Sequence, residues 1–218
     1  MHEKLKKIYD SIVNGEDEGI GPAIILTLEE KFLADQILYE AMIPAMDEVG
    51  RLYEQGIYFL PEMLVAAQTM QTGVSALKPF LVESGVESFG KIAIGTVKGD
   101  LHDIGKNLVM LMLEGAGFEV QDLGVDVAPE RFIEAIQSGA EIIGLSSLLT
   151  TTLAQMKITI DALEIAGLRE RVKVIIGGPV VTNAHANQIG ADGYAPDASS
   201  AVKLVRNILG MEQKRYVK

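Results

Sequence analysis

The stretch KIAIGTVKGDLHDIGKN, residues 91–107, combines three local patterns. KIAIGTV is a short apolar run typical of a buried strand, GDLHDIG is a glycine-rich polar loop, and a helical pattern begins near residue 104. The same succession predicts strands at EVQDL (119–123), EIIGLS (141–146), VKVIIGG (172–178) and, more weakly, DGYA (192–195). Helices are predicted at about 104–116, 129–138, 153–167, 183–189 and 198–210. Strands that alternate with helices indicate βαβ crossovers, so we expect an α/β fold with a doubly wound, five-stranded parallel sheet.

Four loops follow the predicted strands and share a similar composition. They are GDLHDIG (99–105), SSLLTTT (146–152), GGPVVT (177–182) and PDAS (196–199). In a doubly wound sheet the carboxyl ends of the strands lie at one edge, where ligands bind near the switch in strand order. Glycines and small or hydroxylated residues leave room for a ligand to approach the backbone. We therefore expect a slot along this edge.

The sequence before residue 89 has a helical period. Between Pro61 and Leu81, apolar residues recur at alternating steps of four and three, which places them on one face of a helix. KLKKIYDSIVNG (4–15) and LEEKFLADQILYEAMIPAMDEVGRLYEQG (28–56) show similar spacing, and Pro44 should kink or restart the second helix. We predict a helical bundle domain over 1–88, a linker at VESGVESFG (82–90) and an α/β domain over 89–218.

Composition excludes several classes of function. The 218-residue chain has no cysteine, which rules out disulfides, thiolate metal sites and cysteine nucleophiles. A net charge of −11 argues against binding the phosphate backbone of nucleic acids. The amino terminus does not resemble a signal peptide, and no apolar run approaches the roughly 20 residues that span a bilayer. We expect a cytoplasmic protein with no nucleic-acid or membrane partner, whose acidic residues either dock a basic partner or only solvate the surface.

Motifs for several common ligands are missing, whereas one histidine has a suggestive neighbour. The chain lacks G-x-G-x-x-G after the first strand, G-K-[ST], and the G-x-S-x-G spacing of a hydrolase nucleophile. Asp100, two residues before His102, can bind one ring nitrogen and leave the other free for a metal. The alternative is an ordinary loop histidine that bonds the backbone. His185 is not spaced as a second zinc ligand, so a metal here would have to bring its other ligands with it.

Three motifs occur in the order of a known family. They are D-x-H-x-x-G (Asp100, His102, Gly105), S-x-L (Ser146, Leu148) and the pair Gly177 and Gly178. Together they resemble the cobalamin-binding domain of methionine synthase and of small corrinoid proteins. GRLYEQGIYFLPEMLVAAQTM (50–70) is similar to the helical cap module of the same family. The resemblance implies a Rossmann-like or flavodoxin-like cobalamin-binding domain that follows a helical cap.

The resemblance also implies roles for individual residues. His102 would replace the cofactor's own dimethylbenzimidazole base as the lower ligand of cobalt, Asp100 would hold the imidazole, and Thr152 would complete their relay. These three form the implied catalytic set. Further residues implied to contact the cofactor from below, or its nucleotide tail in the slot, are Asp103, Ile104, Gly105, Ser146, Leu148, Thr150, Gly177, Gly178 and Ala198. Asp103 is also expected to cap the following helix.

The implied cap residues are Tyr53, Phe59, Leu60 and Met63, which would lie over the upper face of the corrin. Their alternative is plain bundle core, which the regular apolar stripe favours for Met63.

A cap and a cobalamin domain without further modules imply a carrier that is not catalytic alone. The resemblance implies a corrinoid subunit that takes a methyl group from a substrate-specific methyltransferase and yields it to a second methyltransferase, whose acceptor would be tetrahydrofolate or a similar molecule. The cofactor would be cobalamin, as methylcobalamin or cob(I)alamin, or a related corrinoid, and a reductive activase is a further implied partner. The methyl donor stays open among methanol, methylamines, methoxylated aromatics and betaines. The alternatives are a cobalamin-binding regulator or storage protein, and a flavodoxin-like module for another ligand.

Overall fold

The computed structural model describes residues 1–83 and 90–211. The chain divides into two compact units, Met1–Ser88 with Glu114–Gly117, and Phe89–Leu113 with Phe118–Lys218. Most of the linker predicted at 82–90 lies outside the described residues. Within the described part of the chain, no helix has the length and apolar character needed to cross a membrane.

The first unit is built from helices. They are α1 (Glu3–Asn14), α2 (Asp17–Glu29), α3 (Ala34–Ile37), a π-helical segment (Leu38–Met42), α4 (Ile43–Glu54) and α5 (Leu60–Glu83). The predicted restart at Pro44 takes an unusual form, because α3 runs through the π-helical segment into α4 and Pro44 stands in the first turn of α4. Pro44 lacks an N–H to continue the helical bonding, and the π-helical segment lies directly before it.

The helix predicted to begin at Leu28 is wrong over residues 30–33. Helix α2, which the periodicity did not predict, ends there in a Schellman motif: Phe32 N–H donates to Thr27 O and Lys31 N–H donates to Leu28 O (2.9 Å). Lys31 lies in the left-handed region at φ 69°, which reverses the chain before α3. The apolar periodicity continued across this turn, so it did not reveal the break.

The second unit contains a parallel sheet. Its strands are β1 (Lys91–Val97), β2 (Glu119–Val127), β3 (Ile142–Ser146), β4 (Lys173–Gly177) and β5 (Gly193–Ala195), in the order β2-β1-β3-β4-β5. Its helices are α6 (Ile104–Gly115), α7 (Pro129–Gln137), α8 (Leu153–Ile165), α9 (Asn183–Ile189) and α10 (Ala198–Ile208), with a 3₁₀ turn at Arg169–Arg171. The predicted fold class is confirmed, although β2 extends to Val127, beyond the predicted end at residue 123.

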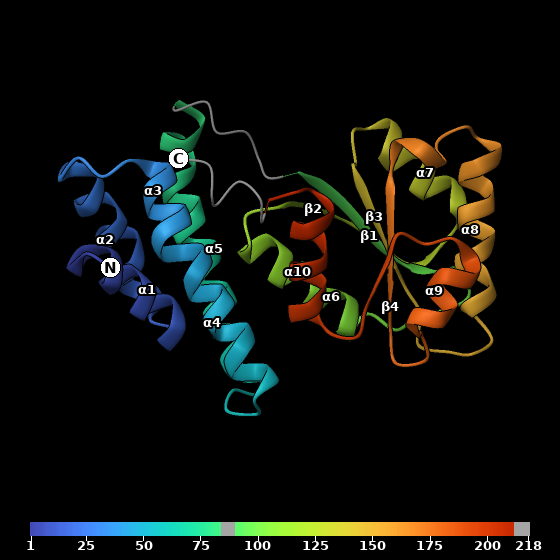
Figure 1. Ribbon diagram of the computed structural model, residues 1–218, viewed down its shortest axis with the longest axis horizontal. Coiled ribbons are helices and arrows are strands. Elements are labelled where there is room, and N and C mark those ends of the chain that lie inside the picture. Colours follow the sequence, from blue (N-terminus) through green and yellow to red (C-terminus); the bar gives the residue numbers. More distant parts are fainter. Residues whose placement is uncertain (84–89, 212–218) are drawn as a thin grey trace. The chain divides into compact units, whose positions relative to one another are not determined.

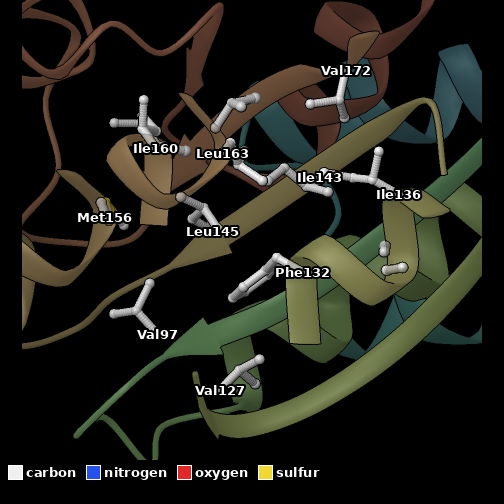
Figure 2. Packing of buried hydrophobic residues seen from close by; sticks show 14 of the residues in the cluster. Val97, Val127, Phe132, Ile136, Ile143, Leu145, Met156, Ile160, Leu163 and Val172 are labelled. Atoms are coloured by element: carbon white, nitrogen blue, oxygen red, sulfur yellow. The ribbon is translucent and has the colours of Figure 1, made fainter. Parts of the chain in front are cut away.

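The helices cover both faces of this sheet. Figure 1 shows α7, α8 and α9 on one face and α6 and α10 on the other. Figure 2 shows Phe132 and Ile136 of α7 packed with Leu145 and Ile143 of β3 and with residues of α8. Burial of each large apolar side chain stabilises the fold by roughly 1.5–3 kcal/mol. This core holds β1 and β3 side by side and thereby fixes where the loops that follow them begin.

The switch in strand order lies between β1 and β3. The chain leaves β1 toward α6 on one face and leaves β3 toward α8 on the other (Figure 1). Such a divergence opens a crevice at the carboxyl ends of the two strands. The loops 98–103 and 147–152 follow these two strands at that edge.

Candidate functional site

A tight turn at Val97–Asp100 follows β1. Asp100 N–H donates to Val97 O (3.1 Å), and Gly99 has a φ of 81°, the left-handed conformation that a type II turn requires at its third residue. The side chain of Asp100 is fully buried by this turn and by the loop after β3.

The Asp100 carboxylate joins the two loops at the switch point. Its Oδ2 accepts from Leu148 N–H (2.8 Å), from Leu149 N–H (3.2 Å) and from Thr152 Oγ1 (2.9 Å). Its Oδ1 accepts from His102 N–H (3.1 Å). Burial acts to raise the pKa of Asp100, but these hydrogen bonds outweigh it and hold the pKa well below its ordinary value. Asp100 is therefore a carboxylate, able to accept hydrogen bonds but not to donate them.

The orientation of His102 follows from this carboxylate. Its Nδ1 lies 2.7 Å from Asp100 Oδ1, so Nδ1 carries the proton that the hydrogen bond requires and Nε2 of the neutral ring keeps its lone pair. The side chain is 52% exposed. Thr96 Oγ1, buried in β1, donates to His102 O (2.8 Å) and holds the backbone. The geometry offers an accessible nitrogen to an external metal.

Exposed apolar side chains occur on the segments that carry the site, which are the loops after β1 and β3, the start of α6 and the end of β2. Leu101 and Ile104 are 71% and 78% exposed, and Leu149 and Val125 are also exposed. Exposed large hydrophobic residues gathered beside a polar group are typical of a ligand surface. Within residues 1–83 and 90–211, no group of three or more His, Asp or Glu side chains could hold a metal ion. A metal with its own flat, apolar ligand fits these residues.

A pair of hydroxyls stands behind Asp100. Thr152, predicted to belong to the relay, is almost fully buried, and Ser147, which sequence reasoning missed, is fully buried. Their oxygens are 2.8 Å apart, and Ser147 Oγ lies 3.4 Å from Asp100 Oδ2. The stretch SSLLTTT contains five hydroxyl residues, and no local pattern sets Ser147 apart from the others. Only the fold of the loop after β3 places its hydroxyl beside Asp100.

The remaining predicted residues of the second unit lie along the same edge. Ser146 ends β3 and pairs in register with Gly177 of β4. Gly105 and Thr150 are exposed, Leu148 is half-buried, and Ala198 is the buried first residue of α10. Asp103, the residue before α6, accepts from Asn107 Nδ2 (3.2 Å).

Gly178 has a structural requirement of its own. Its φ is 130°, and a Cβ there would lie 1.9 Å from Ser147 O. A side chain would displace the loop after β3, so this glycine is needed whether or not a ligand tail passes it.

The predicted cap residues differ in accessibility. Phe59 is 63% exposed and Leu60 also exposed, Tyr53 is half-buried and Met63 is fully buried. Phe59 N–H donates to Glu62 Oε2 (2.9 Å) at the start of α5. Phe59 and Leu60, rather than Met63, present apolar surface on the helical unit.

Comparison with known proteins identifies the family. A B12 binding domain matches residues 90–203, and a second B12 binding domain matches residues 4–78. The chain belongs to the B12-binding corrinoid proteins. Dimethylamine corrinoid protein 1 of Methanosarcina acetivorans is 48% identical to it over 176 residues, which cover 80% of this chain and 83% of the relative. The predicted family and its cobalamin or corrinoid cofactor are thus confirmed.

Two solved structures resemble this corrinoid protein over nearly its whole length. A cobalamin-binding protein from Desulfitobacterium hafniense DCB-2 has a TM-score of 0.77 and 32% identity, covering 98% of each chain. A chain of the methanol:cobalamin methyltransferase complex of Methanosarcina barkeri has a TM-score of 0.81 and 27% identity, covering 99% of this chain and 85% of that one.

Proposed function

We propose that this corrinoid protein is the methyl-carrying subunit of a methyltransferase system. The observation that carries the proposal is the half-exposed imidazole of His102, whose Nδ1 is bound by the buried Asp100 carboxylate and whose chain neighbours Leu101 and Ile104 are exposed apolar residues. The relatives support the role, since they include a dimethylamine corrinoid protein and a chain from a methanol:cobalamin methyltransferase complex.

The residues of the second unit would divide the work of holding the cofactor. When bound, cobalt supplies the centre that accepts and releases the methyl group. His102 Nε2 would be the lower ligand of cobalt in place of the dimethylbenzimidazole base, and Asp100 would keep the proton of the imidazole on Nδ1. Leu101 and Ile104 would contact the corrin ring from below. The nucleotide tail would enter the slot lined by Ser146, Thr150, Gly177, Gly178 and Ala198.

The helical unit, residues 1–88, would act as the cap, and the exposed Phe59 and Leu60 would be among the apolar residues that it places over the corrin. Closed over the upper face, such residues would keep water from the reactive metal, and a partner enzyme would have to displace them.

The partners follow from the carrier role. One would be a substrate-specific methyltransferase, for which methylated amines are the donor class that the dimethylamine relative favours. The other would be an acceptor-side methyltransferase, using tetrahydrofolate or a similar acceptor, and a reductive activase would restore over-oxidised cofactor. The cytoplasmic location stays a prediction of the sequence.

The decisive experiment combines isotope labelling with electron paramagnetic resonance (EPR). Protein grown with ¹⁵N-histidine is reconstituted with cobalamin and reduced to the Co(II) state. If a labelled protein imidazole coordinates cobalt, its ¹⁵N nucleus splits the EPR lines into doublets. If the unlabelled base of the cofactor coordinates instead, its ¹⁴N nucleus splits them into triplets. We expect a doublet for the wild type and its loss in His102→Ala. A triplet in the labelled wild type would contradict the proposed ligand.

Methyl transfer is tested separately. Protein loaded with methylcobalamin should lose its methyl group to an acceptor-side methyltransferase and regain it from a donor-side methyltransferase with dimethylamine, followed by the visible spectrum. A spectrum that does not change with either partner class would favour a regulator or storage protein instead.

A further inference from the structure

The carboxyl end of β2 is bulged beside the site. Gly95 of β1 pairs with Gly124, and Val97 pairs with Val127, so Val125 and Asp126 together face a single residue of β1. A bulge of this kind re-aims side chains at the end of a strand. Both bulged residues are exposed, and they lie beside the turn that carries Asp100.

Asp126 contacts the turn from two sides. Its backbone N–H donates to Asp100 O (2.9 Å), and its Oδ1 accepts from Gly99 N–H (2.6 Å). The carbonyl of Asp100 and the amide of Gly99 are thus both held by one residue of the neighbouring strand. Without Asp126 the Gly99 amide would lose this acceptor, and the turn would keep Asp100 N–H donating to Val97 O and the hydrogen bonds of the Asp100 carboxylate.

Asp126 holds an uncommon backbone conformation. Its φ is 53°, and within residues 1–83 and 90–211 the only other non-glycine residue at positive φ is Lys31. Aspartate and asparagine tolerate this region better than most residues, whereas glycine adopts it freely. A glycine would suit the backbone of the bulge but would lack the carboxylate that binds Gly99. The residue therefore meets two demands at once.

We propose that Asp126 is a positioning residue for the cobalt ligand. It fixes the turn at Gly99 and Asp100, and through the Asp100 carboxylate it fixes the imidazole of His102 (Nδ1 to Oδ1, 2.7 Å). The inference rests on the proposed role of His102 and adds a residue of β2 that lies outside the three motifs of the family resemblance. Residues that hold a ligand in place typically change metal affinity by about 10- to 100-fold when they are removed.

Three substitutions separate the two demands. Asp126→Asn keeps an acceptor oxygen and tolerance of positive φ, Asp126→Gly relieves the backbone but removes the acceptor, and Asp126→Ala loses both. Lys31→Gly is the matched control, because it relieves the other positive φ and belongs to the helical unit rather than to the unit that contains the sheet.

Two readouts follow the turn and the ligand. In the apo protein, amide hydrogen exchange of Gly99 should be faster in Asp126→Gly and Asp126→Ala than in the wild type, and close to wild type in Asp126→Asn. In Co(II)-cobalamin protein labelled with ¹⁵N-histidine, the ratio of histidine-bound to unbound cobalt in EPR should fall about tenfold in the glycine and alanine variants. Asp126→Asn should restore most of it, and Lys31→Gly should leave both readouts unchanged.

A merely structural role would give a different pattern. The proposal would be overturned if Asp126→Gly exchanged the Gly99 amide faster but kept the wild-type ratio of histidine-bound to unbound cobalt. It would also be overturned if that ratio fell equally in Asp126→Asn and Asp126→Ala. These outcomes are distinct from failure of the proposed function, in which the wild type itself shows no histidine doublet.

Discussion

Two hydrogen-bonded carboxylates at opposite edges of the sheet, the half-buried Asp192 and the fully buried Asp100, show what separates a structural anchor from a candidate site. Asp192 precedes β5 at the amino edge, where its Oδ2 accepts from Val174 N–H (2.8 Å) and Arg169 Nη2 (2.7 Å) and its Oδ1 from Lys173 Nζ (3.0 Å). Asp100 follows β1 at the carboxyl edge and bonds backbone amides, a threonine hydroxyl and an imidazole.

The pKa of both carboxyls is lowered for the same reason. Burial opposes ionisation in each, and the hydrogen bonds outweigh it. A lowered pKa therefore does not mark function in this protein. The difference is that the cations beside Asp192 are satisfied within the protein, whereas the imidazole beside Asp100 has a second nitrogen open to a ligand.

Removal of the structural anchor should have the largest effect on stability. Asp192→Ala breaks a mostly buried ion pair and leaves Arg169 and Val174 N–H without this acceptor, so we expect the free energy of unfolding to fall by about 2–4 kcal/mol in urea titrations. The histidine doublet of reconstituted protein should persist in EPR. Loss of the doublet in a variant that still folds would place Asp192 in the functional site and erase the contrast.

Asp100→Asn should reduce the stability of the fold less than Asp192→Ala does, but it should leave the imidazole of His102 without its fixed orientation. Its amide has one acceptor oxygen, so either the loop after β3 or His102 faces an NH₂ group, and we expect a loss of about 1–3 kcal/mol. Because Asp100 orients His102, the doublet should weaken strongly in this variant. A full doublet would show that Asp100, like Asp192, is only an anchor.

Acid should reduce the contribution of both carboxylates. Since each folded pKa lies below the unfolded value of about 3.9, their stabilisation is complete above that value and is lost as the pH falls toward the lowered pKa. The difference in unfolding free energy between the wild type and Asp192→Asn should therefore become smaller between pH 7 and pH 3. Asp35→Asn, for which no such hydrogen-bond network exists among the described contacts, is the control. A constant difference would contradict the assigned cause.

The exposed apolar side chains near His102 should affect cofactor binding and hardly affect the stability of the fold. Ile104→Ala removes a side chain that is 78% exposed, so the free energy of unfolding should change by at most about 0.5 kcal/mol. If a corrin covers this side chain, the Kd for methylcobalamin should rise by about tenfold, measured by absorbance titration. Ile165→Ala on α8, 89% exposed, is the matched control and should change neither quantity. Equal Kd values for the two variants would remove Ile104 from the site.

Much of the second unit was predictable because its signals are local. Each strand and helix there carries its own period, and the loops that follow the strands contain Asp100, His102 and Thr152, which the structure brings together. The helical unit was harder. Helix α2 contains Gly19, Gly21 and Pro22, which weaken a helical pattern, and the turn at Lys31 interrupts an apolar periodicity that continues on both sides.

The residues missed at the site have partners that are distant in the sequence. Ser147 lies 47 positions from Asp100, and Asp126 lies 27 positions from Gly99. A serine among hydroxyl residues and an aspartate at a strand end have no local pattern that sets them apart. Thr96 lies in β1 as the sequence predicts, but the strand pattern does not reveal that its hydroxyl donates to His102 O.

The sequence by itself determined the element types of the second unit, the glycine-flanked histidine and the family, because periodicity, turn chemistry and motif spacing are properties of short segments. The tertiary structure decided which groups meet: the strand order sets the loop after β1 beside the loop after β3, and the bulge of β2 brings Asp126 to the same turn. Hydrogen bonds between these loops depend on strand register and chain crossing, which short-range patterns do not encode. For that reason His102, Asp100 and Thr152 could be proposed from the sequence, whereas the contacts of Ser147, Asp126 and Thr96 with these loops came only from the fold.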